Sequence, residues 1–109
     1  MNINKTNITH SSIRLSLTHN NQEIGRAFLY ILKNELHQEP FALLEDVFVQ
    51  ESHRGQGNGS KIVEAAIDEA KKQNCYKLIC TSRHTKEEVH RLYQKHGFKN
   101  HGIEFRMDF

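Results

Sequence analysis

Polar and apolar residues alternate strictly at the start of the ordered part of the sequence. Residues 13–18 read apolar, polar, apolar in turn, and four polar turn residues at 19–22 separate them from a second apolar stretch at 24–32. Because successive side chains of a strand point to opposite faces, this pattern predicts a β-hairpin. A third strand is predicted at 41–49, which is apolar except for two adjacent carboxylates.

The hydrophobic period changes to that of a helix in the second half. Apolar residues from Ile62 to Ala70 recur at i, i+1, i+4, i+5 and i+8 with charged residues between them, which predicts an amphipathic helix of about four turns. A buried strand is expected at 76–82. The sequence Thr-Lys-Glu-Glu at 85–88 fits a capping box that opens a second helix, which ends at Gly97.

The last seven residues, 103–109, alternate again and predict a fifth strand, with four large apolar side chains on one face. The resulting order is β-β-β-α-β-α-β. We therefore expect an α+β (mixed α/β) fold in which two main helices cover a central, mostly antiparallel sheet. With 109 residues, the chain has room for a single domain, residues 1–109.

Composition favours one folded cytoplasmic domain. Charged residues make up 26% of the chain and the net charge is only +2, which does not suit a disordered protein. No apolar run approaches the roughly 18 residues of a membrane span, and the start of the sequence lacks the apolar segment of a secretory signal. Two cysteines, Cys75 and Cys80, have no second ligand pair at zinc-site spacing, so no metal is expected.

Charge is unevenly distributed between the two halves. Residues 1–53 carry a balance of −2 and residues 54–109 a balance of +4. The second half could receive phosphates. A nucleic-acid-binding domain is nevertheless disfavoured, because residues 83–99 lack an array of stacking aromatics and two glutamates interrupt their positive charge.

The most informative stretch is the glycine-rich loop at 54–60, Arg-Gly-Gln-Gly-Asn-Gly-Ser, between the third strand and the first helix. Amides in the first turn of a helix have no partner inside the helix and lie at the positive end of its dipole, so a phosphate can bind there. Arg54 could add a bidentate contact. The loop matches neither the P-loop nor the Rossmann pattern, and a glycine-rich helix entry without a ligand is the alternative interpretation.

This loop, the preceding Val-Phe-Val and the later sequence Leu-Tyr-Gln-Lys-His-Gly-Phe at 92–98 together resemble the GNAT superfamily of N-acetyltransferases. The resemblance covers residues 41–100 in sequence and the 13–32 hairpin in topology. Within the superfamily, the chain looks most like the diamine (spermidine/spermine) acetyltransferases and their bacterial relatives. The implied reaction is direct transfer of an acetyl group from acetyl-CoA to a primary amine, either a small polyamine-like molecule or a protein amine.

The resemblance also implies a role for individual residues. Tyr93 would be the general acid for the departing thiolate, and Glu45 the general base acting through a water. The pantetheine arm of the cofactor would pair with the strand backbone, and the amides of the loop would bind its pyrophosphate. The expected cofactor-binding residues are Val47, Phe48, Val49, Arg54, Gly55, Gln56, Gly57, Asn58, Gly59 and Ser60.

Alternatives remain open for these assignments. Tyr93 could be an ordinary aromatic at the edge of the core and Glu45 a solvated carboxylate, in which case the chain would be a catalytically idle acyl-CoA-binding module. Asp46 is expected on the opposite face from Glu45, and His90 and His96 are expected to be surface histidines.

The sequence also departs from the family pattern. Lys86 and Val89 replace a usual asparagine and alanine, and Asn58 stands where an aliphatic residue is common. From the sequence as it starts, we also expect the fold to lack the strand and two helices that normally precede the hairpin in this family. Because this leaves apolar surface uncovered, we expect a homodimer.

Overall fold

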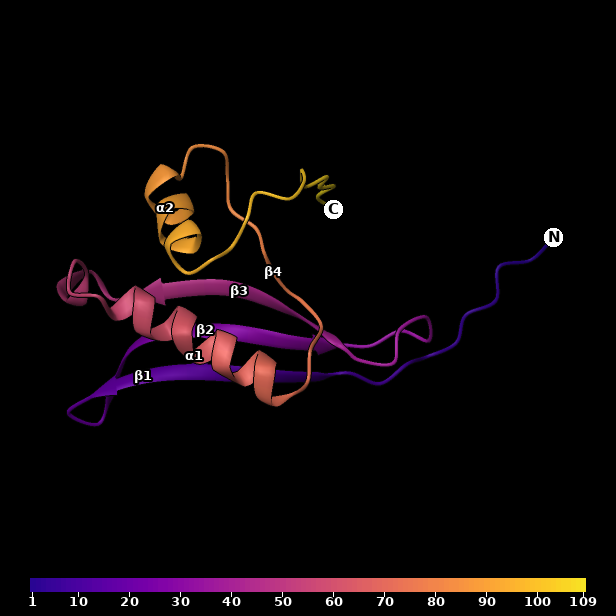
Figure 1. Ribbon diagram of the computed structural model, residues 1–109, viewed down its shortest axis with the longest axis horizontal. Helices are drawn as coiled ribbons and strands as arrows, with labels where there is room; N and C mark the ends of the chain where they lie inside the picture. Colours follow the sequence, from indigo (N-terminus) through magenta and orange to yellow (C-terminus); the bar gives the residue numbers. More distant parts are fainter.

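The first three strands form an antiparallel meander. In the computed structural model, which describes residues 1–109, β1 (Ser11–His19) pairs with β2 (Gln22–Leu32), and β2 pairs with β3 (Phe41–Val49). A short β4 (Leu78–Cys80) lies parallel to β3 and completes a sheet with the order β1-β2-β3-β4 (Figure 1). The predicted hairpin and third strand are confirmed, and so is the α+β fold class.

Helix α1 (Asn58–Lys72) lies across one face of the sheet and contacts β1, β2 and β3 (Figure 1). Its predicted apolar stripe faces the strands. The shared core consists of small and branched side chains that are almost completely shielded from water, chiefly Ala27, Leu29, Ala42, Leu44, Ile62 and Ala66. Because this core is the main interface between helix and sheet, it fixes where the first turn of α1 lies relative to the end of β3.

Gly25 of β2 allows the first turns of α1 to approach the sheet closely. A Cβ atom at this position would lie 2.8 Å from Cδ1 of Ile62 and 3.0 Å from the carbonyl oxygen of Phe48. Both distances are shorter than normal carbon contacts, and the second atom belongs to the backbone and cannot rotate away. A side chain at position 25 would therefore push α1 away from the sheet.

A bulge interrupts β3 at Asp46. The pairing with β2 shifts between Arg26 and Phe28, and Asp46 adopts a φ of 53°. The carbonyl oxygen of Asp46 accepts a hydrogen bond of 2.7 Å from Nη1 of Arg26. The expectation that Asp46 lies opposite Glu45 by regular alternation is wrong, because the extra residue breaks the alternation and leaves both carboxylates exposed.

Both β4 and the start of α2 differ from their predictions. The strand expected at 76–82 shortens to three residues, because only Leu78–Cys80 pair with β3. Helix α2 (Glu87–Lys95) starts after Lys86 without a side-chain cap, so the capping box predicted at 85–88 does not form. A turn in which the amide of Lys86 donates to the carbonyl of Arg83 takes its place.

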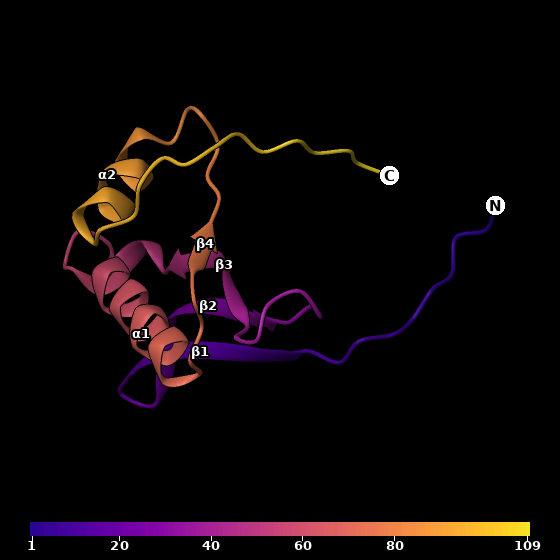
Figure 2. The same ribbon diagram turned by 45° about the vertical axis from the view of Figure 1, so that its right-hand side comes forward.

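The fifth strand predicted at 103–109 is absent. After α2 the chain extends away from the sheet without pairing (Figure 2), and the apolar side chains of this segment are largely exposed. Alternation produces a strand only where the segment pairs with a sheet edge, and residues 103–109 pair with none of the four strands. The homodimer stays a prediction. Neither helix has the length and the hydrophobicity that crossing a membrane requires.

We expect Gly25→Ala to lower the free energy of unfolding by about 1–3 kcal/mol, because the added methyl overlaps Ile62 and the Phe48 carbonyl. The matched control is Gly102→Ala, since a Cβ there meets no atom within 4 Å, and its effect should stay within about 0.5 kcal/mol. Urea unfolding followed by circular dichroism measures both. Equal stability of the two variants would contradict the close approach of α1.

Candidate functional site

The chain turns abruptly from β3 into α1. A short 3₁₀ turn, η1 (Glu51–His53), follows the strand, and Gly55 and Gly57 then adopt left-handed backbone conformations with φ of 73° and 81°. Residues with a side chain rarely adopt these angles, so glycine is required here. Gly57 is the N-cap of α1, and the turn therefore delivers the helix N-terminus directly beside the end of β3.

Two side chains hold this turn in place. Asn58 is buried, and its Nδ2 donates a hydrogen bond of 2.9 Å to the carbonyl oxygen of His53. Nε of Arg54 donates a bond of 2.8 Å to the carbonyl oxygen of Val49. Both residues were among those expected to bind a cofactor. The side chain of Asn58 instead stabilises the loop, whereas the terminal nitrogens of Arg54 make no hydrogen bond within the chain.

Six consecutive amides in the turn have no acceptor in the chain. No hydrogen bond is donated by the backbone N–H groups of residues 55–60, and the first amide of the helix that bonds is that of Lys61, to the carbonyl of Gly57 at 3.2 Å. The last four of these groups, at residues 57–60, form the positive end of the α1 dipole. A row of free donors at a helix N-terminus is an anion-binding arrangement.

All of residues 55–60 except Gln56 line a hollow of about 460 Å³ between the end of β3, the start of α1 and the side of α2. Figure 1 shows α2 above the end of β3 and the first turn of α1. Nine of the twelve residues predicted to form the site line this hollow. They are Val47, Val49, Arg54, Gly55, Gly57, Asn58, Gly59, Ser60 and Tyr93.

One edge of β3 is open beside the hollow. Strand β4 pairs only with residues 42–44 of β3, so from Glu45 to Val49 the strand has a partner on the β2 side alone. An open strand edge can bind an extended chain through its backbone groups. The hollow therefore combines an anion-binding helix end with a strand edge suited to an elongated ligand.

The model of the acetyltransferase (GNAT) domain matches residues 12–100, which is most of the chain. The chain belongs to the GNAT acetyltransferase family. The matched residues include the open edge of β3 and the glycine-rich turn into α1.

Individual GNAT proteins resemble the chain over part of their length. A glucosamine 6-phosphate N-acetyltransferase of Trypanosoma brucei brucei is 34% identical over 65 residues, which cover 60% of this chain and 42% of that protein. The uncharacterized N-acetyltransferase YhfO of Bacillus subtilis is 27% identical over 90 residues, or 83% of this chain and 60% of YhfO. The chain thus spans about half the length of these two relatives.

A solved structure shares the fold. The crystal structure of an acetyltransferase of Trypanosoma brucei superposes with a TM-score of 0.82 at 27% sequence identity, covering 90% of this chain and 69% of that one.

Three residues predicted for the GNAT site lie outside the hollow. Gln56 and Glu45 are exposed. Phe48 is 41% exposed, and its ring packs against two guanidinium groups, 5.1 Å from Cζ of Arg26 and 5.4 Å from Cζ of Arg54. The side chain of Phe48 therefore makes cation–π contacts with Arg26 and Arg54, and only its backbone belongs to the open edge of β3.

Tyr93 lies on α2 and packs against the core, with its ring 5.4 Å from that of Phe98. Burial, and to a lesser degree the neighbouring Cys80, raises the pKa of the Tyr93 hydroxyl to about 12. Burial likewise raises the pKa of the Cys80 thiol to about 11. Both groups are therefore protonated at neutral pH, and Tyr93 can donate a proton but not accept one.

Three residues that were not among the predicted site residues complete the wall of α2. Glu88, Val89 and Leu92 line the hollow together with Tyr93. Their spacing of three to four residues was the available signal, because it places them on one face of a helix. His96, expected to be a surface histidine, is half-buried, and its Nε2 lies 3.0 Å from Oγ of Ser60.

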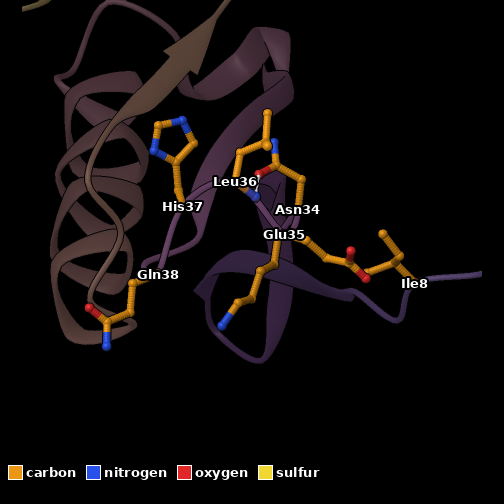
Figure 3. A pocket seen from close by; sticks show the side chains of 7 residues that line it. Ile8, Asn34, Glu35, Leu36, His37 and Gln38 are labelled. Carbon is orange, nitrogen blue, oxygen red and sulfur yellow. Dashed lines mark hydrogen bonds between the residues drawn. The ribbon is translucent and has the colours of Figure 1, made fainter.

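A second hollow, of about 470 Å³, lies between residues 33–38 and Ile8. Figure 3 shows its side chains spread around the β2–β3 connection, with Glu35 extending toward Ile8. It contains none of the residues predicted for the site. The only hydrogen bond there that involves a side chain joins Asn34 Oδ1 to the amide of Leu36 and stabilises the turn itself.

We expect the free energy of unfolding to fall as the pH rises from 9 to about 12. The unfolded chain loses the Cys80 and Tyr93 protons near their ordinary pKa values of 9 and 10, whereas the folded chain keeps them up to about 11 and 12. Over this range the folded state binds more protons, so deprotonation favours unfolding. Urea unfolding at a series of pH values should give a shallower decline in Tyr93→Phe and Cys80→Ala. An unchanged slope in both variants would contradict their burial.

Proposed function

We propose that this chain is an acetyl-CoA-dependent N-acetyltransferase that transfers an acetyl group directly to a primary amine. The observation that supports this most strongly is the row of six free amides at residues 55–60, five of which belong to residues that line a hollow whose opposite wall carries Tyr93. Family membership adds the expectation of acetyl-CoA as acetyl donor.

The residues present fit two adjoining parts of acetyl-CoA, the pyrophosphate and the pantetheine arm. The amides of 55–60 would bind the pyrophosphate, with the free terminal nitrogens of Arg54 beside them. The open edge of β3 at Val47, Phe48 and Val49 would pair with the pantetheine arm, although the carbonyl of Val49 already accepts a bond from Arg54. This pairing would leave the reactive end near α2.

The chemistry requires a donor for the departing sulfur and an acceptor for the proton of the amine. Bound acetyl-CoA supplies an activated thioester. Tyr93 holds its proton at neutral pH, so its hydroxyl would serve as the general acid. The partly dry wall around it strengthens that interaction, since few waters compete.

Glu45 is our proposed general base, acting through a water. Leu44 is buried toward α1, so its neighbour Glu45 lies on the other face of the sheet and is exposed. A base in that position requires the amine to approach from the face of the sheet that α1 does not cover. Donor and acceptor would then reach the reaction centre from opposite sides of β3.

Several classes of amine are candidate acceptors. The resemblance to diamine acetyltransferases suggests a polyamine or a protein amine, whereas the name of the relative from Trypanosoma brucei brucei suggests an amino-sugar phosphate. All of these carry a primary amine. The second candidate function is an idle acyl-CoA-binding module, which shares the amide row and differs in having no use for Tyr93.

Two measurements separate these candidates. Isothermal titration with acetyl-CoA tests the binding that both require. A free-thiol release assay with spermidine, glucosamine 6-phosphate and a lysine peptide tests for transfer. Binding with thiol release above the amine-free rate supports the enzyme, binding alone supports the idle module, and absence of binding at millimolar acetyl-CoA contradicts both.

We expect Tyr93→Phe to lower turnover by roughly 10²–10⁴, because it removes the proton donor and no other atom. Affinity for acetyl-CoA should stay within about threefold, since the amides of 55–60 are unaffected. Steady-state thiol release and calorimetry measure the two quantities.

The matched control is Tyr76→Phe, which removes the same atom from a ring that packs against Phe41 and His37 away from the hollow. Its turnover should equal that of the wild type. Equal turnover of Tyr93→Phe and Tyr76→Phe would reduce Tyr93 to a packing residue.

A further inference from the structure

A single side-chain hydrogen bond joins the two helices that form the site. Nε2 of His96 lies 3.0 Å from Oγ of Ser60 in a partly buried position, and the two residues are 36 positions apart in the sequence. No other side-chain hydrogen bond connects α1 with α2 or with the residue that ends it. The contact therefore links the helix end that carries the free amides to the helix that carries Tyr93.

The two ends of this bond lie next to the proposed reacting groups. Ser60 is the third residue of α1 and the last of the six residues with free amides. His96 follows the last residue of α2 and lies one turn after Tyr93, so both side chains belong to the same side of the helix. Holding His96 against Ser60 thus sets the distance between the Tyr93 hydroxyl and the amide row.

Apart from the His96–Ser60 bond, the packing of Tyr93 against the core and the contact of Leu92 with Gly59 of α1 hold α2 in place. Helix α2 follows β4, which pairs with the sheet over only three residues, and it begins without a side-chain cap. None of its residues is fully buried, in contrast to the five buried residues of α1. A helix held this loosely needs a specific contact to keep one side chain in register with a site on another element.

We propose that His96 is a positioning residue that fixes Tyr93 relative to the amides of residues 55–60 through its hydrogen bond to Ser60. The inference rests on the proposed function. His96 does not touch the reacting atoms in this account. Its role is geometric, and it holds whether the imidazole donates to Ser60 Oγ or accepts from the hydroxyl, because either bond fixes the same distance.

The test compares variants of the full chain in thiol release from acetyl-CoA, with spermidine or glucosamine 6-phosphate as acceptor. His96→Leu should lower kcat about tenfold or more and change KM for acetyl-CoA by less than about threefold, since a displaced Tyr93 slows the chemistry but leaves the amide row intact. His96→Gln, which keeps a polar group near the position of Nε2, should recover most of the loss.

Two further variants show through which residues His96 acts. In a Tyr93→Phe background, His96→Leu should cause no additional loss of kcat, because the hydroxyl that it positions is already gone. The kcat of the double variant His96→Leu/Ser60→Ala should be no lower than that of the single variant with the larger loss. Losses that multiply in either combination would overturn the proposal.

The matched control is His90→Leu, because the ring of His90 also makes one hydrogen bond, to the carbonyl of Arg83, but within its own segment. Its kcat should equal that of the wild type. A tenfold loss in His90→Leu would show that any damage to α2 slows the reaction and would contradict a specific role for His96.

Amide hydrogen exchange tests the link without relying on turnover. Residues 91–98 should exchange at least about threefold faster in His96→Leu and Ser60→Ala than in the wild type, and at the wild-type rate in His96→Gln. Unchanged exchange in His96→Leu overturns the link, even if the chain is an active acetyltransferase. A wild type without turnover, whose exchange nevertheless responds, overturns the proposed function and the catalytic part of this inference while the physical link stands.

Discussion

The left-handed turn at Gly55 and Gly57 is the constraint on which the candidate site depends. It reverses the chain within a few residues, so the N-terminus of α1 lies beside the end of β3 and six consecutive amides have no acceptor in the chain. The hydrogen bond from Asn58 to the carbonyl of His53 stabilises the turn itself, and the packing of α1 on the sheet fixes its position. Without these contacts, the amides would not be held in place for an anion.

The two helices that line the site, α1 and α2, differ in how much of their surface is buried. Helix α1 buries five residues and follows the sheet closely, with Gly25 permitting the approach. Helix α2 buries none fully and meets the rest of the chain through half-buried side chains such as Leu92 and Tyr93. The well-buried helix that carries the free amides thus faces a less buried helix that carries the proposed proton donor, and one side-chain hydrogen bond, between His96 and Ser60, joins them.

Local patterns were sufficient for the parts of the fold that depend on neighbouring residues. The hairpin, β3 and α1 follow from their hydrophobic period, and the glycine-rich loop from its residue types. The bulge at Asp46 escaped prediction because it depends on register with β2. The strand expected at 103–109 failed because alternation cannot tell whether a sheet edge is within reach. His96 was missed because its partner is 36 residues away.

The most direct test of the account is a titration of ¹⁵N-labelled protein with acetyl-CoA, followed by two-dimensional amide NMR. Free amides that gain a phosphate acceptor form new charge-assisted hydrogen bonds, so their proton resonances move downfield. The account predicts that the largest shifts fall on residues 55–60 and that Tyr93 and its neighbours on α2 shift less. Saturable binding that leaves the amides of 55–60 unshifted would contradict it.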